Sequence, residues 1–131
     1  SPGAEVTTEI YLLTYPGDEY VDIMGFDKYS GRTNLAEGMH KVLDIVAPIA
    51  KEHTKILAVS ETGYESIPDP KWWTEQLLPA MEGYPIAYVL TWRNASDRPT
   101  HFFGPWKGAA CEEDFVEFYR SEKTMFISDL K

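Results

Sequence analysis

Short apolar runs alternate along this chain with longer stretches in which apolar residues recur at helical spacing. The runs at residues 20–27, 56–60 and 86–91 predict strands, and the first of them follows a strong turn signal at residues 15–18. The run at 56–60 is apolar nearly throughout, as expected for a parallel strand with both faces covered. This alternating order predicts an α/β fold with a parallel sheet.

The first amphipathic stretch, residues 35–53, predicts a long helix. Asn34 is a favourable N-cap, and Glu37 stands three residues later, as in a capping box. Pro48 lies inside the stretch and is expected to kink the helix or end it early. The residues expected to form its buried stripe are Leu35, Met39, Val42, Val46 and Ile49.

Two further stretches predict helices after the second and third strands. One covers residues 69–82, opening on an Asp-Pro pair and closing before Gly83, with Pro79 expected to distort its last turn. The other begins near Glu112 and follows a long loop, residues 94–110, that is rich in Gly, Pro and aromatic residues. Each strand is therefore followed by a helix.

Polar and aromatic residues follow each predicted strand directly. In parallel α/β proteins, ligands bind at the C-terminal ends of the strands, which meet at one edge of the sheet. A site built by several strands is therefore predicted here. The three segments concerned are Asp27-Lys28-Tyr29, Glu61-Thr62-Gly63-Tyr64 and Trp92-Arg93-Asn94.

Glu61 is the strongest single candidate for a functional residue, because it comes directly after a buried strand. A carboxylate there costs several kcal/mol unless it is paired or solvated. One interpretation is a structural ion pair, and the other is a catalytic carboxylate of the kind that glycoside hydrolysis uses in pairs. Glu65 is a weaker candidate for the catalytic role, since it lies further out in the loop.

The aromatic residues near these strand ends suit carbohydrate binding. Trp92 and Tyr29 could stack on the C–H face of a sugar ring, although core packing is the alternative for a large ring. Arg93 could donate hydrogen bonds to hydroxyl groups or hold Glu61 ionised, and a surface ion pair is its alternative role. Residues 101–103 are a further candidate for facing a substrate.

Composition narrows the function classes. The net charge is −9 and no basic run occurs, which disfavours nucleic-acid binding but is compatible with a neutral polysaccharide. Cys111 is the only cysteine, and no paired His spacing occurs, so no metal site is predicted. No phosphate-binding Gly-rich motif is present, so no cofactor is expected. No apolar run reaches about 18 residues, so no membrane span is predicted.

Four blocks of the sequence resemble glycoside hydrolase family 26, in the order in which that family carries them. They are spread over nearly the whole chain. The blocks are residues 15–29, residues 60–63, residues 88–95 and residues 101–108, and the closing residues 125–129 also fit. The sequence is thus identified as a member of this family.

The resemblance implies a (β/α)8 TIM barrel, of which this chain carries strands 6 to 8 and their helices. Residues 1–131 would then be the C-terminal portion of a single catalytic domain, and residues 1–3 resemble the family's sequence just after the fifth strand. The remaining part of the barrel is an implied partner, since a full barrel takes about 250 residues. We expect the isolated chain to fold poorly and to hydrolyse nothing, because three strands cannot close a barrel.

The resemblance also implies roles. Glu61 would be the nucleophile, with Tyr29 beside it, Asp27 as a nearby structural or substrate-contacting residue, and Trp92 and Arg93 in the substrate cleft. Most members are β-mannanases, which predicts endo-hydrolysis of β-1,4-mannosidic bonds in mannan by a retaining mechanism. The acid/base Glu of the family lies on a strand absent from this chain.

Three further expectations follow from the family. Some members act on mixed-linkage β-glucan or β-1,3-xylan, so these substrates stay open as alternatives. A non-catalytic carbohydrate-binding module that keeps the aromatic platform is another. Family members are mostly secreted or cell-surface proteins, which predicts a secreted, cell-surface or periplasmic location.

Overall fold

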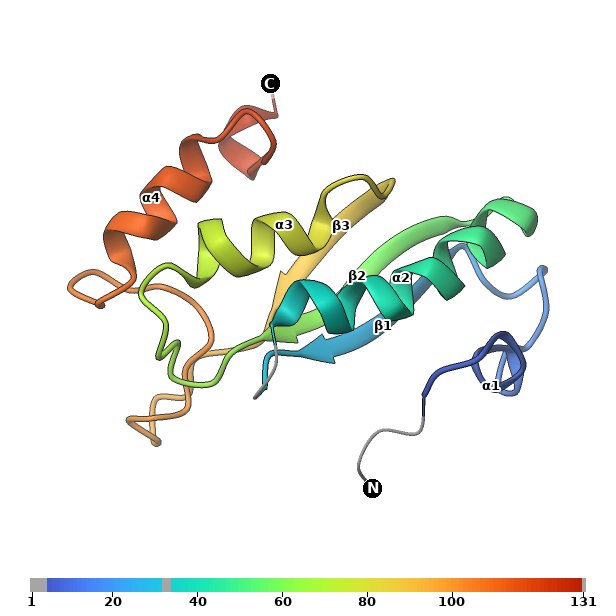
Figure 1. Ribbon diagram of the computed structural model, residues 1–131, viewed down its shortest axis with the longest axis horizontal. Coiled ribbons are helices and arrows are strands. Elements are labelled where there is room, and N and C mark those ends of the chain that lie inside the picture. Colours follow the sequence, from blue (N-terminus) through green and yellow to red (C-terminus); the bar gives the residue numbers. More distant parts are fainter. Residues whose placement is uncertain (1–4, 32–33, 131) are drawn as a thin grey trace.

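A three-stranded parallel sheet forms the centre of the protein, as the strand pattern predicts. The computed structural model describes residues 5–31 and 34–130, so the family block at residues 1–3 lies outside the described residues. The strands are β1 (Ile23–Tyr29), β2 (Ile56–Gly63) and β3 (Ile86–Thr91), and they lie side by side in that order (Figure 1). β1 and β2 run further at their C-terminal ends than predicted, to Tyr29 and Gly63.

Helices follow each strand. In chain order the helical elements are α1 (Thr8–Leu12), α2 (Leu35–Glu52), η1 (Trp72–Leu77), α3 (Leu78–Met81), α4 (Glu112–Arg120) and η2 (Ile127–Asp129). The helix α2 packs directly on one face of the sheet, α3 packs beside it, and α4 lies further out against η1 (Figure 1). No helix of the described part of the chain is long and apolar enough to cross a membrane.

The long helix α2 begins where its N-cap predicts. The Asn34 side chain accepts a hydrogen bond from the backbone N–H of Ala36 at 2.8 Å. The buried stripe is as predicted except at Val42, which is only partly buried while Leu43 is fully buried. On a helix both positions lie near the same stripe, so the spacing alone does not decide between them.

Pro48 was expected either to kink α2 or to end it early, and the early end is wrong. The helix continues to Glu52, and Pro48 lies on its exposed side. A proline removes one helical hydrogen bond, but on a solvent-facing side the freed carbonyl group can be hydrated. Burial of Val46 and Ile49 on the opposite side holds the last turns against the core.

The second predicted helix is divided in two. Its first part, η1, is a π-helical turn in which the N–H of Leu78 bonds to the carbonyl of Trp73, and α3 then begins. Pro79 is the second residue of α3, a single turn that continues directly from η1, so the irregular hydrogen bonding lies immediately before the proline. The buried carboxylate of Asp114 on α4 accepts the N–H of Thr74 at 3.1 Å and also its hydroxyl.

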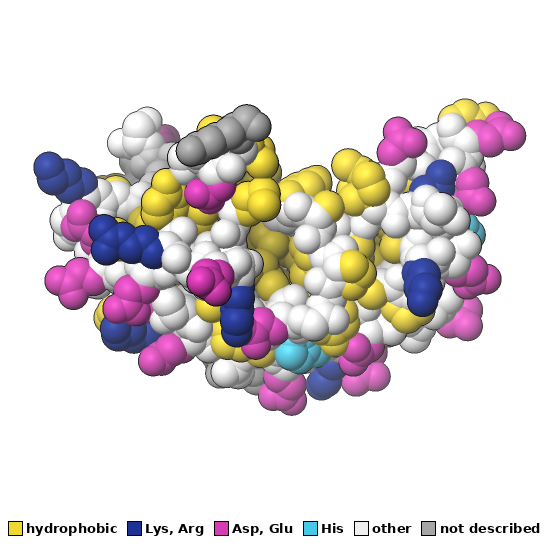
Figure 2. All heavy atoms as spheres, turned by 90° about the horizontal axis from the view of Figure 1, so that it is seen from above, with side chains coloured by type: hydrophobic (Ala, Val, Ile, Leu, Met, Phe, Trp, Pro, Cys, Tyr) yellow, Lys and Arg dark blue, Asp and Glu magenta, His cyan; other side chains and the backbone are white. Residues whose placement is uncertain are grey.

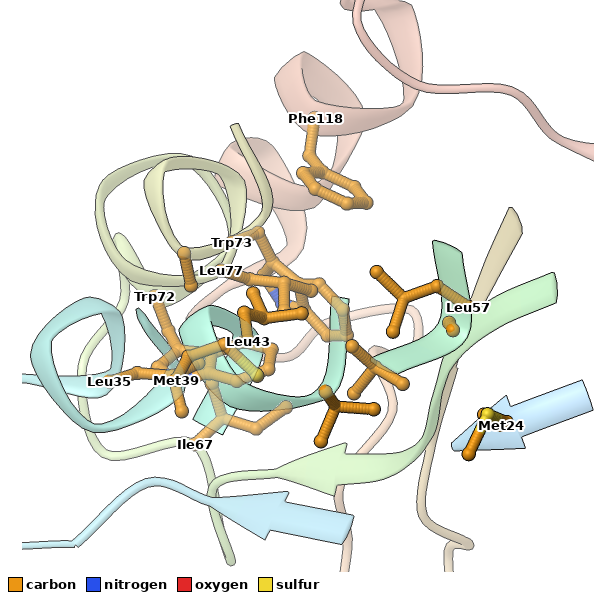
Figure 3. Packing of buried hydrophobic residues seen from close by; sticks show 14 of the residues in the cluster. Met24, Leu35, Met39, Leu43, Leu57, Ile67, Trp72, Trp73, Leu77 and Phe118 are labelled. Carbon is orange, nitrogen blue, oxygen red and sulfur yellow. The ribbon is translucent and has the colours of Figure 1, made fainter. Parts of the chain in front are cut away.

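The core lies between the helices and one face of the sheet. Figure 3 shows side chains from α2 and η1, with Leu57 and Met24 of the strands across from them. The other face carries exposed apolar side chains, namely Ile23, Ile56, Tyr88, Leu90 and Trp92. In Figure 2 hydrophobic side chains gather in the middle of the surface, and acidic ones are spread around them rather than forming one patch.

Leu43 tests the position of this core. Its side chain is 0% exposed, so in the full-length protein Leu43→Ala is expected to lower the free energy of unfolding by about 2–5 kcal/mol. Urea unfolding measures this loss. Leu130, 64% exposed, is the matched control, and Leu130→Ala is expected to change stability by less than about 0.5 kcal/mol. Equal losses for the two variants would contradict the assignment.

Candidate active site

An extra residue in β2 decides which way Glu61 points. Where β2 pairs with β1, Val59 lies opposite Phe26 and Glu61 lies opposite Asp27. Ser60, between them, therefore has no partner on β1. Side chains alternate between the two faces of a strand, and Leu57 and Val59 both belong to the core cluster on the helix-covered face. Without the bulge Glu61 would follow them into the core. The bulge resets the alternation and turns Glu61 to the open face beside Asp27.

The neighbours of the bulge fit this geometry. Ser60 points to the same side as Asp27 and donates a hydrogen bond to its carboxylate at 3.1 Å. A Cβ added at Gly25 would lie 2.8 Å from the Ser60 hydroxyl oxygen, so the glycine leaves room for the bulged side chain. Directly after Glu61 the alternation resumes, and Thr62 is fully buried.

Tyr29 contacts the Glu61 carboxylate directly. It follows Asp27 by two residues on β1, which places it on the same open face, and its hydroxyl donates a hydrogen bond to Glu61 Oε1. Partial burial and this hydrogen bond raise the pKa of Tyr29 above its ordinary value. Tyr29 is therefore a neutral donor at physiological pH.

No ion pair involving Glu61 is found among the described residues. The pairs present there join His53 to Asp18, His101 to Glu65, and Lys123 to Glu82. The structural ion-pair interpretation of Glu61 therefore finds no partner in this part of the chain. Arg93 is not paired with Glu61 either, so of the alternatives considered for Arg93 this one finds no support.

The third strand brings an aromatic ring to the same edge of the sheet. The backbone N–H of Trp92 donates to the carbonyl of Thr62 at 3.0 Å, which continues the pairing with β2 past the end of β3. The Trp92 side chain is 38% exposed, so it is not a core residue in this structure. Arg93 is exposed next to it.

Residues 101–103 lie differently from the expectation that they face a substrate. Phe103 is 6% exposed and packs against Gly63 and the ring of Tyr29. His101 is partly buried, with Nδ1 at 3.0 Å from Glu65 Oε1. Glu65, the weaker carboxylate candidate, is thus bonded to His101, while Glu61 is bonded to Tyr29.

The sequence pattern did not indicate the bulge at Ser60 or the packing of Phe103 against Gly63. Gly63 was the available signal, because a glycine within a strand often marks a bulge or a close approach of another group. No group of three or more His, Cys, Asp or Glu side chains suited to a metal is found within residues 5–31 and 34–130.

Comparison with known proteins identifies the family. A family model described as Glycosyl hydrolase family 26 matches residues 2–101. The chain belongs to this family. Over 90% of its length it is 30% identical to the mannan endo-1,4-beta-mannosidase of Bifidobacterium adolescentis, of which it covers 14%. The family assignment agrees with the resemblance seen in the sequence.

Solved structures of family 26 proteins resemble the chain closely. A β-mannanase from Bacteroides ovatus is 43% identical with a TM-score of 0.90, over 95% of this chain and 37% of that one. The catalytic domain of an endo-β-1,4-mannanase from Bacillus sp. JAMB-750 is 30% identical with a TM-score of 0.82, over 98% and 38%. The chain therefore spans less than two fifths of these family 26 structures, and its sheet belongs to a TIM-barrel family.

The contact between Tyr29 and Glu61 can be tested by titration. A phenolate beside a carboxylate is disfavoured, so replacing the carboxylate with an amide removes part of the cause that raises the pKa of Tyr29. In the family 26 domain that carries this chain, Glu61→Gln is expected to lower the pKa of Tyr29. NMR of ¹³Cζ-labelled tyrosine measures it, with the Tyr29 signal assigned by its absence in Tyr29→Phe.

Tyr84 provides a matched control for this titration. Its hydroxyl donates to Asp44 Oδ1 at 2.5 Å, and this bond raises its pKa to about 12. Asp44→Asn is expected to lower the pKa of Tyr84 and leave Tyr29 unchanged. If Glu61→Gln left the pKa of Tyr29 unaltered while the control responded, the hydrogen bond between Tyr29 and Glu61 would be absent in solution.

Proposed function

We propose that this chain is the C-terminal part of the catalytic domain of a retaining endo-β-1,4-mannanase, with strands β1 to β3 as strands 6 to 8 of the barrel. Glu61 is the proposed nucleophile. The observation that carries the proposal is the position of Glu61 in a family 26 chain, at the C-terminal end of a central strand, turned to the open face and bonded to Tyr29. Ligands of TIM barrels bind at this end of the strands.

The proposed reaction is a double displacement. The Glu61 carboxylate attacks the anomeric carbon of a mannosyl unit while a carboxylic acid protonates the leaving glycosidic oxygen, giving a glycosyl ester on Glu61. The resulting carboxylate then takes a proton from water, which attacks the same carbon and releases Glu61. The configuration at the anomeric carbon is thereby retained.

The acid/base residue is proposed to lie outside this chain. A nucleophile and its acid/base flank the scissile bond from two sides, with their carboxyl groups about 5–5.5 Å apart in retaining enzymes. Asp27 is the cross-strand neighbour of Glu61, so it lies on the same wall of the site and is bonded to Ser60. We therefore assign Asp27 a structural or substrate-contacting role and not that of the proton donor.

The remaining site residues have supporting roles. Tyr29 binds one oxygen of Glu61 and so orients the carboxylate, which leaves Oε2 for the attack on the sugar. The partly exposed ring of Trp92 suits stacking on a sugar ring at the cleavage site, and Arg93 suits hydrogen bonds to sugar hydroxyls. No cofactor takes part in this chemistry.

Mannan is the proposed substrate because relatives of this chain are named as mannanases. A polysaccharide such as mannan does not cross a membrane, so the proposed location is secreted, cell-surface or periplasmic. Apart from Trp92, the exposed apolar side chains on the open face of the sheet are the proposed contact with the rest of the barrel.

Substitution of Glu61 tests the nucleophile. In the catalytic domain that carries this chain, Glu61→Ala is expected to lower kcat/KM on β-mannan by about 10³-fold or more. Sodium azide is expected to restore turnover and to yield an α-glycosyl azide, because azide attacks from the side that the carboxylate has vacated. Initial rates and NMR of the products measure both effects. Glu65→Ala is the matched control and is expected to keep activity within about twofold.

Several outcomes would contradict the proposal. Undiminished activity in Glu61→Ala would remove this residue from the mechanism. An inactive wild type on mannan that cleaves mixed-linkage β-glucan or β-1,3-xylan would change the substrate and keep the class. Binding of mannan without turnover, unchanged in Glu61→Gln, would make the protein a carbohydrate-binding module.

Trp92 tests the sugar platform. Trp92→Ala is expected to raise KM for mannan by about tenfold, because the sugar ring loses a stacking partner worth about 1 kcal/mol or more. Trp92→Phe keeps a smaller flat ring and is expected to give an intermediate KM. Initial-rate kinetics distinguish the three proteins, and identical KM values would show that Trp92 does not contact the substrate.

A further inference from the structure

Phe103 packs against both strands that carry the candidate nucleophile and its hydrogen-bond donor. Its side chain is 6% exposed, although it comes from the long loop after β3. The ring meets that of Tyr29 edge to face, with centroids 5.7 Å apart and planes at 70°. This is a favourable aromatic geometry. Phe103 therefore supports the ring of Tyr29, and the hydroxyl of that tyrosine binds Glu61.

Gly63 makes this close approach possible. A Cβ at this position would lie 2.6 Å from Cδ1 of Phe103, which no side chain permits. The backbone of Gly63 has φ +152°, in a region that favours glycine. Its carbonyl also accepts the N–H of Ser30 at 2.8 Å, which joins the end of β2 to the residue after Tyr29. Phe103 thus rests where β1 and β2 end together.

Asn94 fixes the backbone of Phe103. Its Oδ1 accepts the N–H of Phe103 at 2.9 Å and the N–H of Gly104 at 2.8 Å, and its Nδ2 donates to the Gly104 carbonyl at 3.2 Å. Asn94 stands two residues after Trp92. One side chain therefore ties the far part of the loop back to the end of β3.

The loop is also fastened to the segment that follows β2. The N–H of Ser66 donates to the carbonyl of Phe102 at 2.8 Å, and the Ser66 hydroxyl donates to the carbonyl of Thr100. The His101 ring lies edge to face on Phe103, with centroids 5.2 Å apart. Contacts on both sides of Phe103 thus leave its ring little freedom.

We propose that Phe103, held by Asn94, is a positioning residue that keeps the Tyr29 hydroxyl on the nucleophile Glu61. This inference rests on the proposed function. Tyr29 is 37% exposed, and without Phe103 its ring has room to leave the rotamer in which the hydroxyl reaches Glu61. A displacement of about 1 Å of a reacting group can cost about 10²-fold in rate, so a support outside the substrate site can affect catalysis.

A double-mutant cycle in the complete catalytic domain tests the proposal. Phe103→Leu and Asn94→Ala are each expected to lower kcat on β-mannan about three- to tenfold with little change in KM, since they leave the sugar contacts intact. In a Tyr29→Phe background the same changes are expected to have almost no effect, because the hydroxyl they position is gone. Additive losses in the two backgrounds would mean a merely structural role and would overturn the proposal.

Phe102 supplies the matched control. It precedes Phe103 in the loop and contacts Trp106 instead of Tyr29, with ring centroids 5.9 Å apart. Phe102→Leu is expected to leave kcat within about twofold of wild type. An equal loss of kcat in Phe102→Leu and Phe103→Leu would also overturn the proposal.

A second readout does not depend on activity. The ¹³Cζ chemical shift of Tyr29 reports the hydrogen bond to Glu61, and it is expected to move in Phe103→Leu and Asn94→Ala but not in Phe102→Leu. If it moves as expected while the wild type lacks hydrolase activity, the positioning stands and the proposed function fails. If Glu61→Ala abolishes activity but the shift is unchanged in both loop variants, the function stands and the positioning fails.

Discussion

The bulge at Ser60 is the constraint on which the candidate site depends. A strand with both faces in use commits every second residue to the core, and Leu57 and Val59 take the buried positions in β2. The next position in that series belongs to Glu61. One extra residue moves the carboxylate from the core, where it would cost several kcal/mol, to the open face where chemistry can take place.

The two faces of the sheet therefore have different roles, one in packing and the other in forming the candidate site. The helix-covered face holds the tightly packed side chains of α2 and η1, which fix the strands in place. The open face presents Asp27, Tyr29 and Glu61 from neighbouring strands at one edge. Since each of these side chains is attached to a strand, the backbone pairing sets where it leaves the sheet, and the loop residue Phe103 then packs against the ring of Tyr29.

Much of this arrangement could be predicted from the sequence, because its causes are local. The apolar runs predicted the parallel strands, and Asn34 predicted the start of α2. The carboxylate and the tyrosine were also indicated, since they directly follow strands. The bulge could not be predicted, because it depends on how β1 and β2 pair, and an unpaired strand has no register.

The failures of prediction have the same origin. Pro48 is tolerated because it lies on the exposed side of α2, and whether Val42 or Leu43 is the more buried depends on how the helix sits on the sheet. Phe103 comes from a loop that gives no periodic signal, and its position follows from the hydrogen bonds of Asn94 and from the missing side chain of Gly63. Each outcome depends on contacts between residues distant in sequence.

The choice of a tyrosine to hold Glu61 has a chemical consequence. In the proposed mechanism the Glu61 carboxylate gives up its charge as it forms the ester, so any partner that stabilises the free carboxylate more than the transition state slows the attack. A guanidinium close to Glu61 would do so strongly through a bidentate ion pair. A neutral hydroxyl on one oxygen orients the group at smaller cost, and no cation among the described residues pairs with Glu61. The raised pKa of Tyr29 keeps that hydroxyl protonated, so the donor persists through the pH range in which a carboxylate can act.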